Sequence, residues 1–235
     1  ITVLSGVTVT STDGAVILLA GDNVTIQSGA TVEGQTGLMF YTDIGNEIDP
    51  DGGDITIAGN LISGAGKVYM ETSDRADTIL FDTSATFDFG KRPETGVMND
   101  FVLNTKGGDD TVTIKANLSA DHIVISTGTG NDTLTTLGTL TAIGIYQGVG
   151  KDRVGRDVRI DMGNDTDAHD TISLGGKVTA TRDVVITKLP TTEHSVVIGI
   201  DKDTDPLEVP VGEAGQRSVT KIGRASCRER VSSPV

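Results

Sequence analysis

The sequence contains no tryptophan, six prolines and one cysteine, Cys227, and only 3% of its 235 residues are aromatic. A single cysteine excludes a disulfide framework, and the three histidines share no spacing that suits a metal site. No GxSxG, Walker or HExxH motif is present. The apolar run at residues 15–20 is far shorter than the roughly 18 residues of a membrane helix. We therefore expect no membrane span.

Positive charge is also scarce in this chain. Nineteen Lys and Arg residues stand against 33 Asp and Glu residues, which gives a formal net charge of −14. A nucleic-acid-binding protein relies on a basic patch to neutralise phosphates. The charge balance excludes that class, and we expect no nucleic-acid partner.

The abundant residues are threonine, glycine and aspartate, with 33, 30 and 25 copies. Threonine favours strands over helices, glycine weakens both, and aspartate prefers turns and helix caps to helix interiors. The composition predicts an all-β protein with many tight turns.

An acidic turn followed by threonine and an alternating strand recurs along the chain, at residues 75–80, 108–114, 130–134 and 169–174, with a degraded copy at 150–154. Each copy is marked by one aspartate: Asp77, Asp110, Asp132, Asp152 and Asp170. The spacings between successive marks are 33, 22, 20 and 18. A second motif of two short strand-like pieces returns between the marks. One such unit cannot bury its apolar side alone.

Stacking identical coils would bury the inward Val, Ile and Leu side chains in shared columns and pair the backbone along one axis. We therefore expect a right-handed parallel β-helix with about 20 residues per coil. A β-sandwich also has short strands at intervals of about 8–12 residues, but it does not predict the same turn chemistry in every coil.

The pattern varies along the chain. We expect irregular coils with loop insertions over residues 1–100, regular coils with acidic turns over 101–190, and a terminal or frayed coil over 191–221. Residues 222–235 are basic and lack the period-two pattern. They resemble a translated sequencing-adapter read-through, which predicts a non-native tail. The chain begins at Ile1 without an initiator methionine, so we expect flanking coils of a longer polypeptide.

The acidic turns have a specific electrostatic consequence if the coils stack in register. Asp110, Asp132, Asp152 and Asp170 would form one column with neighbours about 5 Å apart, where like charges repel. Hydrogen bonds from turn amides, partial protonation or a divalent cation would each offset this repulsion. Calcium is the natural cation because it accepts carboxylate, amide and backbone oxygens in loose geometry. Metal-free turns and calcium turns remain alternatives.

Residues 128–134 resemble the glycine- and aspartate-rich calcium turns of RTX-type proteins, and residues 107–112 are similar. The resemblance implies calcium bound between stacked turns. The turn residues that would supply ligands are Asp109, Asp110, Asn131, Asp132, Asp152, Asn164, Asp165 and Asp170. Those proteins repeat the motif in tandem on two sides of a roll, whereas this chain has one copy per coil.

Residues 15–190 resemble bacterial secreted or surface β-helical repeat proteins of adhesin type. The resemblance implies an extracellular or cell-surface structural or adhesive segment without enzymatic activity, which favours calcium and has a surface glycan or protein as its receptor. The alternative is a carbohydrate-active β-helix enzyme, either a polysaccharide lyase or a hydrolase. Its site would use the mixed-charge patch of Arg153, Arg156, Asp157, Arg159 and Asp161.

Overall fold

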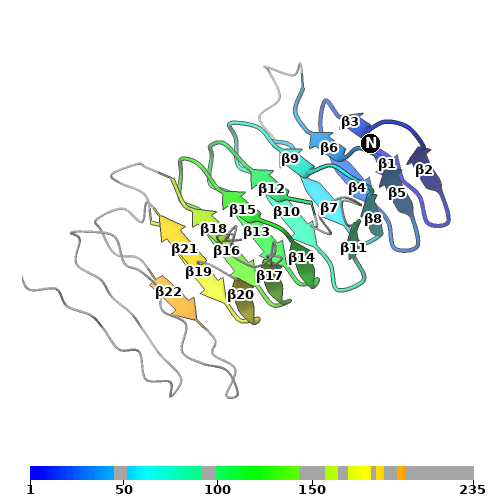
Figure 1. Cartoon of the computed structure of the whole chain (residues 1–235). Coiled ribbons are helices and arrows are strands. Elements are labelled where there is room, and N and C mark those ends of the chain that lie inside the picture. Colours follow the sequence, from blue (N-terminus) through cyan, green and yellow to red (C-terminus); the bar gives the residue numbers. More distant parts are fainter. Residues whose placement is uncertain are drawn as a thin grey trace, which may run out of the picture.

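A computed structural model describes residues 1–44, 52–90, 99–142, 157–163, 169–180, 184–187 and 195–198. The described residues contain strands and turns and no helix. Every strand pairs in parallel with a strand of a neighbouring coil, and the coils stack along one axis (Figure 1). The chain is a parallel β-helix, as its repeats predict.

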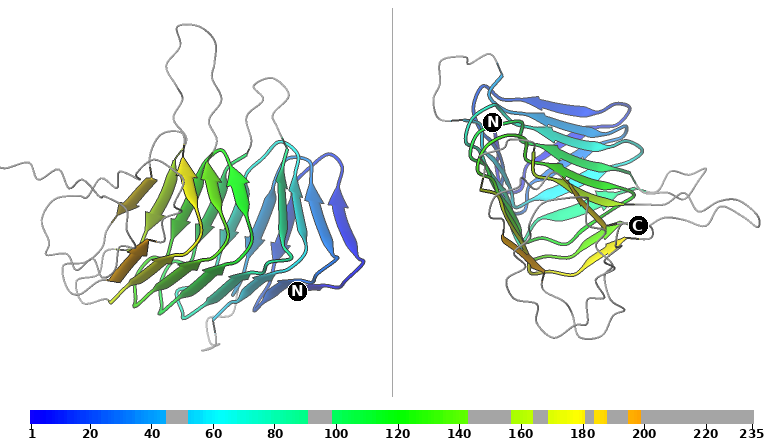
Figure 2. Two further views of the ribbon diagram at one scale, coloured as in Figure 1. Left: turned by 90° about the horizontal axis from the view of Figure 1, so that it is seen from below. Right: turned by 90° about the vertical axis from the view of Figure 1, so that its left-hand side faces the viewer.

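Each coil visits three faces in turn, as the end-on and side views show (Figure 2). The eight-stranded sheet contains β1 (Thr2–Val3), β4 (Val24–Ile26), β7 (Ile55–Ile57), β10 (Thr78–Phe81), β13 (Thr111–Ile114), β16 (Thr133–Thr136), β19 (Thr171–Leu174) and β22 (Ser195–Ile198). The seven-stranded sheet contains β3 (Val16–Leu19), β6 (Leu38–Tyr41), β9 (Val68–Glu71), β12 (Phe101–Asn104), β15 (Ile123–Ser126), β18 (Val158–Asp161) and β21 (Val184–Thr187).

The third face is divided between two shorter sheets. One holds β2 (Thr8–Ser11), β5 (Thr31–Gly34), β8 (Asn60–Ser63) and β11 (Thr86–Phe89), and the other holds β14 (Leu118–Ala120), β17 (Leu140–Ala142) and β20 (Val178–Ala180). Three phenylalanines, Phe81, Phe89 and Phe101, pack near this division, with ring centroids of Phe81 and Phe101 5.7 Å apart.

The strand registers give the coil length directly. The sequence offset between paired residues of the eight-stranded sheet lies between 22 and 24 in four coils, and it is 31, 33 and 38 in three others. Uninterrupted coils are therefore slightly longer than the repeat spacing predicts. The longest coil, with an offset of 38, lies within residues 101–190, where the sequence predicts regular coils. The segments predicted at the C-terminal end lie outside the described residues from residue 199 onward.

The prediction of one coil for every interval between successive marks is wrong between Asp132 and Asp170, which are neighbours in the stack. Thr133 pairs with Thr171 in adjacent strands, so the chain between them completes a single coil. The spacings of 20 and 18 residues add up to the 38 residues of this one long coil. Sequence spacing alone does not distinguish one long coil from two short ones. Asp152 itself lies outside the described residues.

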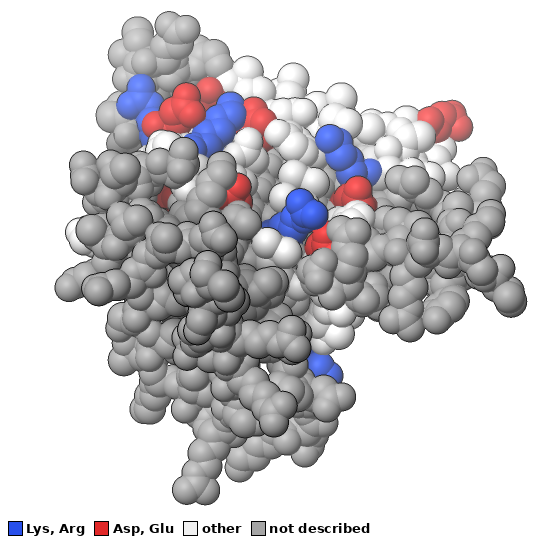
Figure 3. Space-filling view, turned by 60° about the vertical axis from the view of Figure 1, so that its left-hand side comes forward, with Lys and Arg blue, Asp and Glu red and all other residues white. Residues whose placement is uncertain are grey.

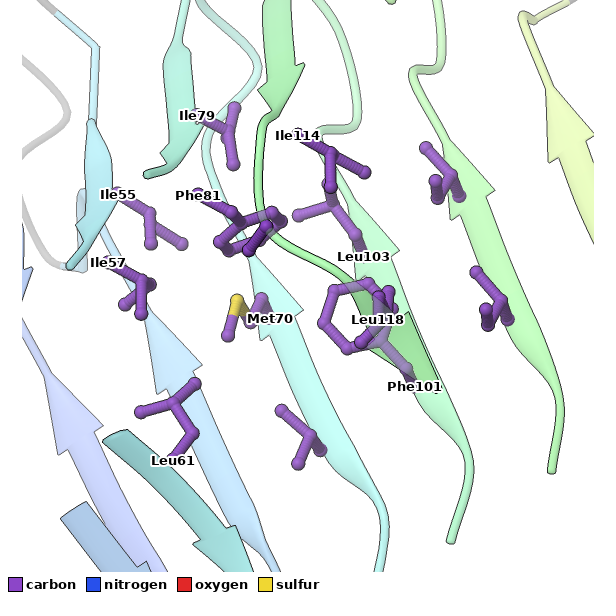
Figure 4. Packing of buried hydrophobic residues seen from close by; sticks show 14 of the residues in the cluster. Ile55, Ile57, Leu61, Met70, Ile79, Phe81, Phe101, Leu103, Ile114 and Leu118 are labelled. Atoms are coloured by element: carbon purple, nitrogen blue, oxygen red, sulfur yellow. The ribbon is translucent and has the colours of Figure 1, made fainter. Parts of the chain in front are cut away.

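Apolar side chains that alternate along the strands of the middle coils fill the interior (Figure 4). In β13, for example, Val112 and Ile114 are fully buried while Thr111 is exposed. Inward residues of successive coils stack in columns, because each register position pairs with the equivalent position of the next coil. The same stacking controls the polar side chains at the turns.

Candidate functional site

The acidic turn links the seven-stranded sheet to the eight-stranded sheet in each coil. Its marker aspartates lie in one column, as predicted for Asp110, Asp132 and Asp170, and Asp77 extends the column by one coil. All four residues are no more than 2% exposed. The column is therefore part of the interior rather than of the solvent-facing surface.

Backbone amides connect the members of this buried column. The Asp77 N–H donates to Asp110 Oδ1 at 2.9 Å, the Asp110 N–H donates to Asp132 Oδ1 at 2.9 Å, and the Asp132 N–H donates to Asp170 Oδ1 at 3.0 Å. The Gly53 N–H donates to Asp77 Oδ1 at 2.6 Å in the same way. Each carboxyl group thus joins its own coil to the preceding one.

A column of buried threonines runs beside the aspartates. Thr42, Thr72, Thr105 and Thr127 each follow a strand of the seven-stranded sheet directly. The Thr72 hydroxyl donates to the Thr105 carbonyl at 3.3 Å, and the Thr105 hydroxyl donates to the Thr127 carbonyl at 2.8 Å. The turn therefore contains two parallel sets of coil-to-coil hydrogen bonds.

Burial makes the charged form of these carboxyl groups costly. It raises the pKa of Asp110 to about 8, although the Thr105 side chain and the Asp77 amide oppose the rise. The charges of Asp132 and Asp77 raise the pKa further. Burial also raises the pKa of Asp77, against the hydrogen bonds that its carboxyl group accepts. The hydrogen bonds therefore favour the charged carboxylates, whereas burial and mutual repulsion favour their protonated form.

A second, exposed column lies one position before the buried one. The Asn131 N–H and Nδ2 both donate to Asp109 Oδ1, at 2.8 and 3.1 Å, and the His169 N–H donates to Asn131 Oδ1 at 2.9 Å. The structure therefore brings the predicted ligands Asp109 and Asn131 together, and it joins them through hydrogen bonds.

The remaining predicted metal ligands Asp152, Asn164 and Asp165 lie outside the described residues. Within the part of the chain that is described, no group of three or more His, Cys, Asp or Glu side chains is placed to hold a metal ion. Calcium binding at the turns stays a prediction.

The turn glycines have a packing role. A Cβ atom on Gly130, whose φ is +130°, would lie 2.0 Å from the Gly108 carbonyl oxygen of the neighbouring coil. A Cβ on Gly128 would lie 1.5 Å from the Lys106 carbonyl oxygen. Glycine at these positions is required by the close approach of stacked backbones.

The predicted mixed-charge patch is only partly described, because Arg153 and Arg156 lie outside the described residues. The exposed Arg159 forms an ion pair with the buried Asp157, with Nη2 and Oδ2 3.1 Å apart. Asp161 Oδ1 accepts a hydrogen bond from the Gly163 amide. On the face shown in Figure 3, positive and negative side chains lie side by side.

Sequence reasoning missed the threonine column, although a signal exists. Four strands of the seven-stranded sheet are followed at once by threonine, in the segments at residues 38–42, 68–72, 101–105 and 123–127. Reading the residue after each strand in register would have found it.

Comparison with protein-family models, curated proteins and solved structures gave no match. Within the described ranges, no helix is long and apolar enough to cross a membrane.

Proposed function

We propose that this chain is a stiff structural or adhesive segment of a secreted or cell-surface protein, without enzymatic activity. The observation that carries the proposal is the double column of buried aspartates and threonines. These recurring polar residues form hydrogen bonds between coils. Such contacts, repeated along one axis, resist shear between coils and suit a spacer or a rigid platform.

Single-molecule pulling tests the mechanical part of this proposal. The chain would be stretched between handles at its two ends, at pH 6. We expect discrete force peaks, and we expect lower peaks in Asp110→Ala because that change removes a coil-to-coil hydrogen bond. Asp13→Ala is the matched control, since Asp13 is exposed in the first coil. Extension without resolved peaks in the unsubstituted chain would overturn the proposal of a stiff segment.

The carbohydrate-active enzyme is the rival function. Incubation with neutral and acidic polysaccharides, followed by measurement of new reducing ends and unsaturated products, separates the two. The scaffold proposal expects no product above the buffer control. Catalytic turnover that rises with protein concentration would contradict it.

A further inference from the structure

A cavity of about 300 Å³ lies at the turns that follow β6 and β9. Tyr41, Asp43, Glu71, Asp74 and Lys106 are among its lining residues. They come from three successive coils, which the register of β6, β9 and β12 brings side by side (Figure 1). The cavity adjoins the buried columns of the turn, because Thr42 and Thr72 also line it, but none of the column aspartates does.

Aromatic side chains form one part of this region. The rings of Tyr41 and Tyr69 are 5.7 Å apart at a tilt of 48°, and Lys67 Nζ lies 4.5 Å from the centroid of the Tyr69 ring. Ile17 and Leu19, on the adjacent strand β3, are 53% and 57% exposed. An apolar surface therefore borders the polar cavity.

An ordered set of charges forms the other part. Glu71 Oε1 lies 2.8 Å from Lys106 Nζ, and the Tyr69 hydroxyl donates to Glu71 Oε2. Burial alone would raise the pKa of Glu71, but the hydrogen bonds from Lys106 and Tyr69 outweigh it and lower that pKa. Glu71 is therefore held as a carboxylate in a fixed position at neutral pH.

Asp43 supplies an acceptor that the protein leaves unused. Its side chain is only 10% exposed, and its buried Oδ1 atom has no hydrogen-bond partner among the described residues. Arg75 Nε lies 4.0 Å from the other oxygen, Oδ2. A buried acceptor without a donor costs free energy, and a ligand hydroxyl would relieve that cost.

The backbone gives independent support. Among the described residues, Asp43 and Lys106 are the two non-glycine residues with positive φ, at 55° and 66°. Both line this cavity. Residues held in this conformation are uncommon and gather at functional sites.

We propose that this cavity binds a neutral, hydroxyl-rich saccharide, a proposal that rests on the adhesive role proposed above. A tyrosine ring packs against the C–H face of a sugar, carboxylates accept its hydroxyls, and an ammonium group donates to its oxygens. Three carboxylates and one ammonium group line the cavity. This excess of negative charge disfavours uronates and selects neutral sugars.

Titration calorimetry with the full chain tests this assignment. The probes are neutral hexasaccharides of glucose, mannose and galactose, with an oligogalacturonate as the acidic probe. We expect at least one neutral probe to bind and the uronate not to bind. Absence of binding by every neutral probe, or preferential binding of the uronate, would overturn the proposal.

Variants locate the binding. Tyr41→Ala should weaken it about tenfold by removing the stacking ring, while Tyr41→Phe should retain it. Asp43→Asn should weaken it about fivefold, because a neutral amide is a weaker acceptor and asparagine tolerates positive φ. Leu137→Ala, at an exposed turn after β16, is the control and should bind normally. Equal affinity in all four variants would place binding elsewhere and refute the assignment.

The two proposals fail in different ways. If no saccharide binds but the pulling experiment shows force peaks, the saccharide site is refuted and the scaffold remains. If a saccharide binds and is cleaved, the scaffold proposal is refuted while the site remains.

Discussion

Asp109 and Asp110 are neighbours in the chain, but the fold places them in opposite environments. Asp109 is exposed and accepts two hydrogen bonds from Asn131, whereas Asp110 is 1% exposed and accepts the Asp77 amide. Alternation at the entry to β13 sends one side chain outward and the next inward. The same residue type therefore serves two columns, and only the inner one carries a desolvation cost.

The comparison shows how this solenoid tolerates polar groups inside. Each inner carboxyl group meets an amide of the adjacent coil, so stacking supplies the donor that solvent no longer provides. A single coil does not offer this partner. The buried aspartates thus depend on neighbouring coils more than the exposed column does.

The largest effect is expected where stacked backbones come closest. Gly130→Ala places a Cβ 2.0 Å from a backbone oxygen of the neighbouring coil, whereas Gly6→Ala places one in open space. Both glycines have positive φ, +76° for Gly6 and +130° for Gly130, so a side chain is strained at each, but only Gly130 also meets the stacked coil. We expect Gly6→Ala to lower the free energy of unfolding by about 1–2 kcal/mol and Gly130→Ala by more than about 4 kcal/mol. Urea unfolding followed by circular dichroism measures both, and equal losses would contradict the close stacking.

The next largest loss of stability is expected in the buried aspartate column, compared with the exposed column. Asp110→Ala leaves the Asp77 amide buried without this acceptor. We therefore expect the free energy of unfolding to fall by about 3 kcal/mol at pH 6. The partner of Asp109, Asn131, is already in contact with water, so we expect Asp109→Ala to lower the free energy of unfolding by less than about 1 kcal/mol. Urea midpoints of the two variants test this difference. A larger loss in Asp109→Ala would show that the outer column is the stabilising one.

The pH dependence of stability follows from the raised pKa of Asp110. Between its ordinary value of about 3.9 and its folded value of about 8, the folded state holds a proton that the unfolded state has released. Stability therefore falls as the pH rises through this range, by up to about 1.4 kcal/mol per pH unit for one such group. The stability that this group contributes is fully present below about pH 4.

Asp110→Asn sharpens this test because the asparagine oxygen still accepts the Asp77 amide but does not titrate. We expect the variant to exceed the unsubstituted chain in stability at pH 8 and to lose part of the slope between pH 5 and 8. Asp109→Asn is the matched control and should leave the slope unchanged. Urea unfolding midpoints at four pH values measure the slope of stability against pH. An unaltered slope in Asp110→Asn would show that Asp110 does not bind a proton on folding.

The sequence predicted the fold and one column because both depend on periodicity. Turn residues that recur at coil-length intervals must stack, which placed Asp110, Asp132 and Asp170 together. Periodicity did not reveal which turn residue points inward, since Asp109 and Asp110 fit the pattern equally. It also failed between Asp132 and Asp170, where two predicted repeat intervals belong to a single coil of 38 residues.

The cavity was beyond sequence reasoning for a different reason. Glu71 and Lys106 form an ion pair although they are 35 positions apart, and Asp43 and Arg75 are 32 apart. These distances reflect coils of unequal length, so no fixed spacing marks them. Only the strand registers bring the four side chains to one place.

Calcium is expected to have the smallest effect, and it probes the outer column. Asp109 Oδ1 already accepts two hydrogen bonds from Asn131, and the inner carboxyl groups are buried behind it. We therefore expect weak calcium binding, seen as a small calcium-specific rise of the thermal midpoint over the value in chelator, with magnesium as the ionic control. A ligand at 100 times its dissociation constant would stabilise the folded chain by about 2.7 kcal/mol, which such a measurement detects easily. A calcium-specific rise that Asp109→Asn abolishes would place the metal at these turns, a rise that survives the substitution would place calcium elsewhere in the chain, and equal midpoints would contradict calcium binding.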